Sequence, residues 1–283
     1  MNHSSSRSPG RTGSLPAREA HVATRLGRLH VRVVGDGPTT VLWPSMFVDS
    51  HTWDPVVPLL PEGRRYVLVD PPGLGLSDAL RQRSDIVGAA DAAVDLLAGM
   101  GVDGPVDWVG NAFGGHVGFE LGARPGVLRS LVAVSSPAEA LPAGLRKQVT
   151  MLLPVLRWLG PVAPVRSAIV AGMLTDASAA EEPIRRVVVD SLDRPSRRST
   201  ALAVRSFILD RRDVSDQLAD LAVPSLFVAS DDRGDWSPDD ARRSAAATPD
   251  AEVVTITGAR TLVPLEQPEA FAAHVRRFWE RLD

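Results

Sequence analysis

The chain of 283 residues contains no cysteine. Disulfide bonds, thiolate metal ligands and a cysteine nucleophile are therefore excluded. Tyrosine occurs once, and Lys147 is the one lysine among the 31 basic residues. We attribute this arginine bias to a GC-rich genome, and it carries no functional information.

Long apolar runs and a strong charge imbalance are absent as well. No segment approaches the roughly 20 apolar residues of a membrane-spanning helix. The net charge of −3 gives no electrostatic reason to expect nucleic acid or a membrane as a partner. Residues 1–18 are rich in Ser, Arg, Gly and Pro and lack the apolar core of a secretory signal. We therefore expect a disordered tail at 1–18, a cytoplasmic location and a small molecule as the ligand or substrate.

Strand and helix patterns alternate from residue 20 onward, which is typical of a mostly parallel sheet covered by helices on both faces. The sequence predicts an α/β fold with a twisted, eight-stranded sheet. The expected strands are His21–Leu26, Leu29–Val34, Thr40–Trp43, Tyr66–Asp70, Val106–Val109, Leu128–Val134, Ser225–Ala229 and Glu252–Ile256. The expected helices of this part lie near His51–Leu60, Asp85–Met100, Ala112–Ala123, Pro238–Ala247 and Pro268–Leu282.

The alternation stops between Ser136 and about Arg212, where helical, Arg-rich patterns follow one another. The helices expected there are Leu145–Leu159, Val162–Leu174, Glu181–Leu192 and Ser199–Leu209. We therefore divide the chain into a core, residues 19–136 and 209–283, and a helical cap, residues 137–208, inserted into that core.

The segment Val109-Gly110-Asn111-Ala112-Phe113-Gly114-Gly115 has the frame of a nucleophile elbow. An apolar run leads into it, and an apolar-periodic helix follows. Such an elbow needs its flanking glycines because a Cβ atom there would collide with the neighbouring strand and helix. The apex here is Ala112, whose methyl group cannot attack a substrate. The sequence thus predicts the turn of an acyl-transfer enzyme without its nucleophile.

Three other segments support a family resemblance. Residues 67–78 (VLVDPPGLGLSD) form an apolar strand followed by a Gly-rich turn, residues 223–228 (VPSLFV) form a late strand, and residues 258–268 (GARTLVPLEQP) form a loop near the end. With the elbow, they make the chain resemble the α/β-hydrolase family from about Ala20 to Leu282. In that family the late strand leads to the acid of the catalytic triad and the loop carries its histidine.

The resemblance implies a catalytic triad in which two of the three catalytic residues are replaced. Ala112 stands at the nucleophile position and Thr261 at the histidine position, while Asp232 keeps the acid, with Asp231 and Asp235 beside it. A serine nucleophile needs a base within hydrogen-bond reach, because an alcohol is a poor nucleophile at neutral pH. A threonine hydroxyl cannot serve as that base.

The resemblance also places an oxyanion loop after the third expected strand, where the chain reads Trp43-Pro44-Ser45-Met46-Phe47. By position, the backbone N–H groups of Ser45 and Phe113 would form the donor pair, which can polarise a carbonyl without a covalent step. We expect a closed pocket between cap and core lined by Ser45, Met46, Phe47, Ala112, Phe113, Asp232 and Thr261, with Trp43, Asn111 and His51 as further pocket residues.

Several of these side chains have alternative roles. Asp232 either pairs with Arg260 or a cap arginine, or acts as a general base if an apolar roof raises its pKa. His51 either has a capping or interface role or reaches the pocket. His116, on the elbow helix, is expected to pack or pair beneath the sheet. No pair of histidines has metal-ligand spacing, so we expect neither a metal nor another cofactor.

Three functional hypotheses fit these residues. The protein could be a noncovalent catalyst, of isomerase, cyclase or lyase type, that orients and polarises a mostly apolar small molecule. It could bind a ligand without catalysis, as a receptor, carrier or partner subunit. It could also be a serine hydrolase disabled by substitution, but the loss of the histidine at Thr261 argues against a single engineered change. We favour the noncovalent catalyst.

Overall fold

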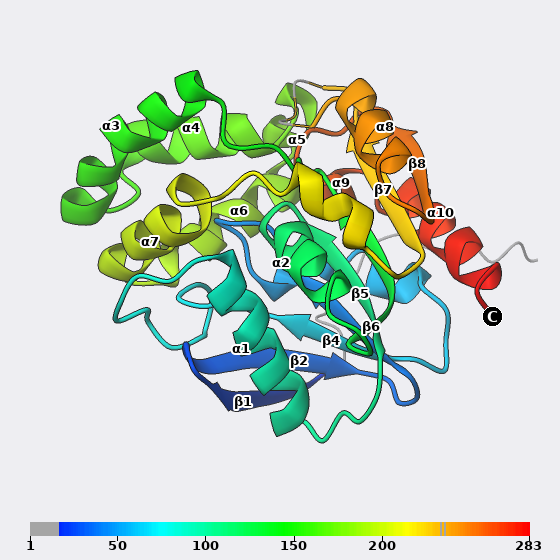
Figure 1. The fold of residues 1–283 in the computed structure, drawn as a ribbon. Coiled ribbons are helices and arrows are strands. Elements are labelled where there is room, and N and C mark those ends of the chain that lie inside the picture. Colours follow the sequence, from blue (N-terminus) through cyan, green and yellow to red (C-terminus); the bar gives the residue numbers. More distant parts are fainter. Residues whose placement is uncertain (1–16, 233, 235) are drawn as a thin grey trace, which may run out of the picture.

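The computed structural model describes residues 17–232, 234 and 236–283 (Figure 1). The tail expected at 1–18 lies, up to residue 16, outside the described residues, and so does Asp235. The first strand begins at Arg18, which is earlier than the His21 expected from the sequence. None of the helices in the described ranges has the length and hydropathy of a bilayer-spanning segment.

The sheet has eight strands in the order β1-β2-β4-β3-β5-β6-β7-β8. The strand β2 pairs antiparallel with β1 and β4, and all later pairs are parallel. This arrangement confirms the predicted fold class. The strands are β1 Arg18–Thr24, β2 Gly27–Val34, β3 Thr39–Trp43, β4 Arg65–Val69, β5 Val106–Asn111, β6 Leu128–Val134, β7 Ser225–Ser230 and β8 Ala251–Ile256.

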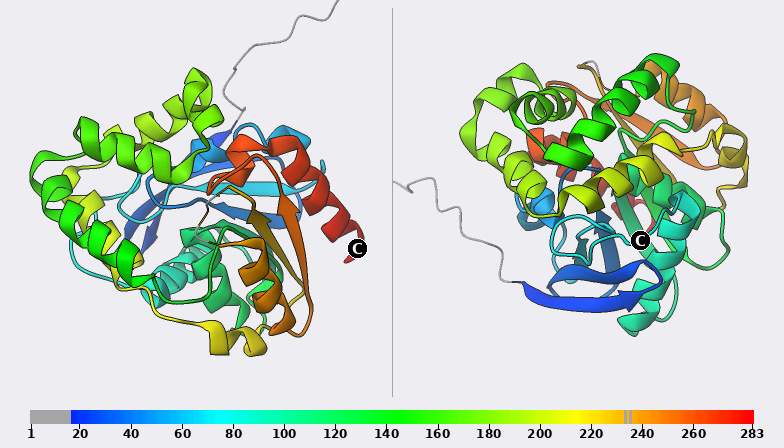
Figure 2. Two further views of the ribbon diagram at one scale, coloured as in Figure 1. Left: turned by 90° about the horizontal axis from the view of Figure 1, so that it is seen from above. Right: turned by 90° about the vertical axis from the view of Figure 1, so that its left-hand side faces the viewer.

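Helices cover both faces of the sheet, as the two further views show (Figure 2). Strand residues alternate between two apolar clusters: Val67 and Val69 belong to one and Leu68 to the other. The first cluster is covered by α1 Ile86–Gly99, α2 Phe113–Gly122 and α8 Pro238–Ala246. The second is covered by the 3-10 turns η1 Ser50–Trp53 and η2 Val57–Leu59 and by α10 Pro268–Glu280.

The segment between β6 and β7 is almost entirely helical and lies above one edge of the sheet (Figure 1). Met173 and Leu174 of this segment pack against Leu262 and Leu265 in the loop that follows β8. The short helix α5 was not expected from the sequence. The α7 helix continues as the π-helical turn η3, and the 3-10 turn η4 precedes β7. The bounds are α3 Ala143–Leu159, α4 Ala163–Met173, α5 Asp176–Ala180, α6 Glu182–Asp193, α7 Arg197–Ala203, η3 Val204–Leu209 and η4 Ser215–Asp220.

The elbow between β5 and α2 keeps its strained backbone. Ala112 has φ 45° and ψ −100°, a conformation that non-glycine residues rarely adopt. A Cβ atom at Gly110 would lie 2.1 Å from the carbonyl oxygen of Gly114, and one at Gly114 would lie 2.0 Å from that of Trp43. Since both clashes are with backbone atoms, only glycine fits at these two positions.

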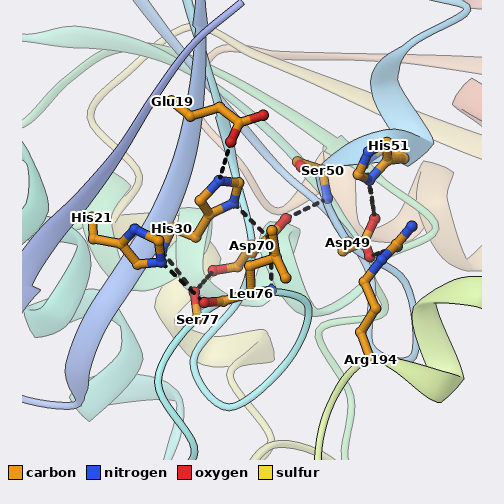
Figure 3. A network of polar contacts seen from close by, with 10 residues as sticks. All are labelled: Glu19, His21, His30, Asp49, Ser50, His51, Asp70, Leu76, Ser77 and Arg194. Atoms are coloured by element: carbon orange, nitrogen blue, oxygen red, sulfur yellow. Dashed lines mark hydrogen bonds and ion pairs between the residues drawn. The ribbon is translucent and has the colours of Figure 1, made fainter. Parts of the chain in front are cut away.

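A buried polar network fixes the loop that follows β4 (Figure 3). One carboxylate oxygen of Asp70 accepts the Leu76 N–H at 2.8 Å and lies 2.9 Å from His30 Nδ1, and the other accepts the Ser50 N–H at 2.9 Å. His30 and Asp70 are both 1% exposed. The hydrogen bond to Asp70 is the main cause that raises the pKa of His30, and burial opposes it.

The raised pKa of His30 makes a prediction about stability. Protonated His30 is favoured in the folded state, so its contribution is fully present below the unfolded pKa of about 6.5 and is lost as the pH rises through the folded pKa. The stability advantage of the native chain over His30→Gln, measured by urea unfolding at a series of pH values, should shrink as the pH rises above neutrality. In an Asp70→Asn background this pH dependence should disappear or change sign, because burial alone opposes protonation of the ring. With Asp70 present, an advantage that grew with pH would contradict the account.

Candidate functional site

A cavity of about 340 Å³ lies between the helical insertion and the carboxyl ends of the central strands. The insertion contributes apolar residues from α3, α4 and η3, among them Leu153, Leu156 and Phe207. From the core, the residues at its wall include six that the sequence had placed there: Ser45, Met46, Phe47, Ala112, Phe113 and Thr261. The topology of the sheet brings these six together because each follows the carboxyl end of a strand.

Two expected pocket residues lie behind this wall instead. Trp43 stacks on Trp108 with 5.4 Å between the ring centroids, and Phe113 covers its edge. Asn111 is fully buried, and its amide donates to the carbonyls of Val134 at 3.2 Å and Thr261 at 2.9 Å. Their assignment to the pocket was wrong because both side chains point back into the packed elbow.

His51 also lies away from the cavity wall. Its Nδ1 is 2.9 Å from Asp49, which is fully buried and is also paired with Arg194 of the insertion (Figure 3). Burial by itself would raise the pKa of Asp49, but the hydrogen bond from His51 and the charge of Arg194 outweigh it and lower the pKa. His51 therefore belongs to an ion-pair link between core and insertion, and its placement in the pocket was wrong.

Asp232 is not at the cavity wall, because Arg260 holds it. Nη2 of Arg260 donates to Asp232 at 2.9 Å, and the guanidinium, 5% exposed, also bonds the carbonyl of Ala171 in α4. Below it, the carboxylate of Glu266 accepts the backbone N–H groups of Arg260 at 2.8 Å and Thr175 at 2.7 Å. Of the two roles expected for Asp232, the structure shows the pairing with Arg260.

Thr261, which the sequence analysis placed at the histidine position, is bound to the same helix. Its backbone N–H donates to the carbonyl of Met173 at 3.1 Å, and its hydroxyl donates to that of Gly172 at 3.3 Å. The neighbouring Leu262 N–H also donates to Met173, at 3.3 Å. The loop that follows β8 is thus fastened to the end of α4, at the roof of the cavity.

His116 is a cavity residue that the sequence analysis missed. It lies one helical turn after Ala112 on the same side of α2, and this spacing could have revealed it. Its Nε2 lies 2.9 Å from the carbonyl oxygen of Pro137, which can only accept, so Nε2 carries the hydrogen and Nδ1 is an acceptor. Among the described residues Nδ1 has no hydrogen-bond partner. Burial, aided by the charge of Arg211, lowers the pKa of His116 to about 3, so the ring is neutral near pH 7.

Arg211 was missed as well. It is buried, lines the cavity beside His116, and donates through Nη2 to the carbonyl of Glu139 at 2.9 Å. It belongs to the segment Asp210-Arg211-Arg212-Asp213, and four consecutive charged residues are typical of a solvent-exposed surface. Its burial follows from the path of the chain back to the core, which no local pattern encodes.

The wall of the cavity is mostly apolar. Its polar lining consists of Ser45, His116, Gln148, Arg211 and Thr261, and the remainder is apolar or glycine. Ser45 and Phe113, the two residues expected to supply oxyanion donors, both stand at the wall. Within the described ranges no group of three or more Asp, Glu, His or Cys residues could hold a metal ion.

Removing the guanidinium of Arg260 should loosen the link between core and insertion. We expect Arg260→Met to lower the free energy of unfolding by about 2 kcal/mol, because buried hydrogen bonds to charged groups are lost. Hydrogen exchange should accelerate in residues 171–176 and 260–266. Arg242→Met, which breaks an exposed pair with Asp239, is the control and should cost less than about 1 kcal/mol. Equal effects of both variants would contradict the structural role given to Arg260.

Comparison with known proteins agrees with this architecture. A relative from Stutzerimonas stutzeri (strain A1501), named "Putative carbamate hydrolase RutD", is 30% identical over 141 residues, and the match spans only about half of either chain (49% and 52%). A thermophilic esterase from Thermogutta terrifontis superposes with a TM-score of 0.84 at 20% identity, over 94% of this chain and 99% of the esterase. An enol-lactonase from Burkholderia xenovorans LB400 gives 0.83 at 20% identity, over 92% and 100%. Residues 40–274 match the model of the alpha/beta hydrolase family, and the chain therefore belongs to that family.

Proposed function

We propose that the protein is a cytoplasmic, noncovalent catalyst of isomerase, cyclase or lyase type that acts on a mostly apolar small molecule. The observation that carries the proposal is the combination of a strained elbow at Ala112 with a cavity directly above it. The frame of a hydrolase site is kept, while the triad is degenerate at Ala112 and Thr261.

The retained strain supports continued use of the site. A non-glycine residue with positive φ costs about 1–3 kcal/mol, and such strain persists where the surrounding structure enforces it, often at functional sites. Here it holds Ala112 and Phe113 at the cavity wall, at the N-terminal end of α2. A helix N-terminus carries partial positive charge, which favours a developing oxyanion or enolate.

The lining suggests the class of ligand. A cavity of about 340 Å³ is at the small end of the range for ligand sites, and its apolar walls suit a hydrocarbon or aromatic body. The guanidinium of Arg211 would attract a carboxylate or a polarised carbonyl oxygen. Nδ1 of the neutral His116 would accept a hydrogen bond from a hydroxyl or N–H of the same ligand. We therefore expect a small molecule with an apolar body and one oxygen-bearing end.

Noncatalytic ligand binding is the alternative, and the pairing of Asp232 with Arg260 favours it, since that carboxylate is then a poor general base. The printed names of the similar proteins, a carbamate hydrolase, an esterase and an enol-lactonase, denote reactions at a carbonyl group. Polarisation of a carbonyl needs no nucleophile, so it is the part of such chemistry that this site could retain.

The first test concerns hydrolysis. The native chain should not react with a fluorophosphonate probe and should hydrolyse p-nitrophenyl acetate at most about 10³-fold faster than water. Ala112→Ser or Thr261→His alone should change little, because the two groups act as a unit. The double variant should recover only weak activity, since Asp232 remains bound to Arg260. Strong hydrolysis by Ala112→Ser alone would reveal a base already in place, with His116 as the first candidate, and would favour the disabled hydrolase.

The second test concerns the cavity. Gly172 lines it, and a Cβ atom there would meet no atom within 4 Å, so Gly172→Phe should fold and fill the space. Small molecules that co-purify with the native chain, identified by mass spectrometry, should bind this variant about 10-fold or more weakly. Gly144→Phe is the matched control: a Cβ atom there also meets nothing, but the residue is not at the cavity wall. Unchanged ligand binding by Gly172→Phe would contradict the proposed site.

A further inference from the structure

One outer face of the helical insertion exposes apolar side chains. Met151, Trp158 and Leu159 of α3 are 61%, 64% and 65% exposed, and Val162 in the following turn is 36% exposed. Residues seven and eight apart lie two helical turns away from each other on the same side, so Met151, Trp158 and Leu159 form one stripe. In the described part of the chain, the other large apolar residues that are at least 36% exposed are Leu152, next to Met151 on α3, and the single residues Leu76 and Val87.

Positive charge lies beside this stripe. Residues 141–175 contain four basic and no acidic residues, and residues 194–209 contain four arginines and no acidic residue. Of these, Arg166 is paired with Asp193 and Arg194 with Asp49, and most acidic residues of the insertion lie between the two ranges. The whole-chain charge of −3 conceals this local surplus. Where α3 ends beside the start of α7, a hollow of about 270 Å³ is lined by Arg157, Arg197 and Arg198 together with Trp158 and Ser196. None of these three arginines forms an ion pair with a residue of the described ranges.

We infer that this face docks onto the surface of an anionic lipid bilayer. We define the docking face as Met151, Trp158, Leu159 and Val162 with Arg157, Arg197 and Arg198. An exposed tryptophan beside aliphatic side chains is suited to the boundary between headgroups and acyl chains, and guanidinium groups bind phosphate. Arg157 lies 5.8 Å from the Trp158 ring centroid, so cation and ring would enter the interface together.

Charge also decides against a second copy of the chain as the occupant. A symmetric contact through this face would bring two unpaired arginine clusters together, and like charges across an interface disfavour association. An anionic bilayer instead supplies both an apolar layer for the stripe and phosphate groups for the guanidinium groups.

The docking face adjoins the cavity. Two residues of α3, Gln148 and Leu152, line the cavity, and Leu152 is also 40% exposed to solvent. The same helix therefore forms part of the cavity wall and part of the outer surface. An apolar ligand dissolved in the bilayer would meet the molecule beside that wall. The docking itself does not depend on what the cavity does.

Trp158 provides a direct probe, because the other five tryptophans are at most 1% exposed. The full chain is mixed with vesicles of phosphatidylcholine alone or with phosphatidylglycerol added, and binding is followed by co-sedimentation. We expect binding to the anionic vesicles, weakening as salt is raised. Vesicles with brominated acyl chains should quench the Trp158 fluorescence.

Two variants and a matched control test the docking face. The triple variant Arg157→Gln/Arg197→Gln/Arg198→Gln should bind anionic vesicles about 100-fold more weakly, because each lost charge weakens binding roughly five-fold. Trp158→Ser should lose both the quenching and part of the binding. Arg242→Gln/Arg243→Gln/Arg281→Gln removes the same charge from exposed positions on α8 and after α10 and should bind as the native chain does.

Four outcomes would overturn the inference. These are an absence of binding, equal binding to neutral and anionic vesicles, an equal loss in the control variant, or binding without quenching of Trp158. Sedimentation velocity tests whether a second copy of the chain covers the face instead. If the chain does not bind vesicles but forms a dimer, and Trp158→Ser dissociates that dimer, the face belongs to a contact between two copies.

Discussion

At Ala112 the chain leaves the central strand β5 in a left-handed conformation and turns at once into α2. The turn requires glycine at 110 and 114, because the backbone approaches itself and Trp43 too closely for a Cβ atom. It also places Phe113 and His116 at the cavity wall. The position of the site thus depends on one strained residue, in a turn of the kind that carries the nucleophile in other proteins.

A second constraint joins the core to the insertion. In a triad the acid orients a histidine, whereas here Asp232 receives the guanidinium of Arg260. Arg260 and Thr261 bond the carbonyls of Ala171, Gly172 and Met173, so the loop after β8 is joined to the end of α4. The loop therefore anchors the roof of the cavity.

The sequence predicted what local patterns encode. Alternating strands and helices predicted the eight-stranded, mostly parallel sheet, and the glycines around Ala112 predicted the elbow; the order of the strands came from the structure. Asp232 and Trp43 were misplaced, because a side chain's direction depends on neighbours distant in sequence: Arg260 draws the carboxylate away, and Trp108 holds the indole behind the wall. Arg211 could not be predicted, since its burial follows from the fold of the insertion as a whole.

Conversion of the ligand in the cavity without a covalent intermediate can be followed by intact-protein mass spectrometry during incubation with the ligand that co-purifies, together with analysis of that ligand over time. We expect an unchanged protein mass while the ligand is converted to an isomer or an elimination product, with conversion lost in Gly172→Phe. An acylated protein, or products that have gained water, would contradict it.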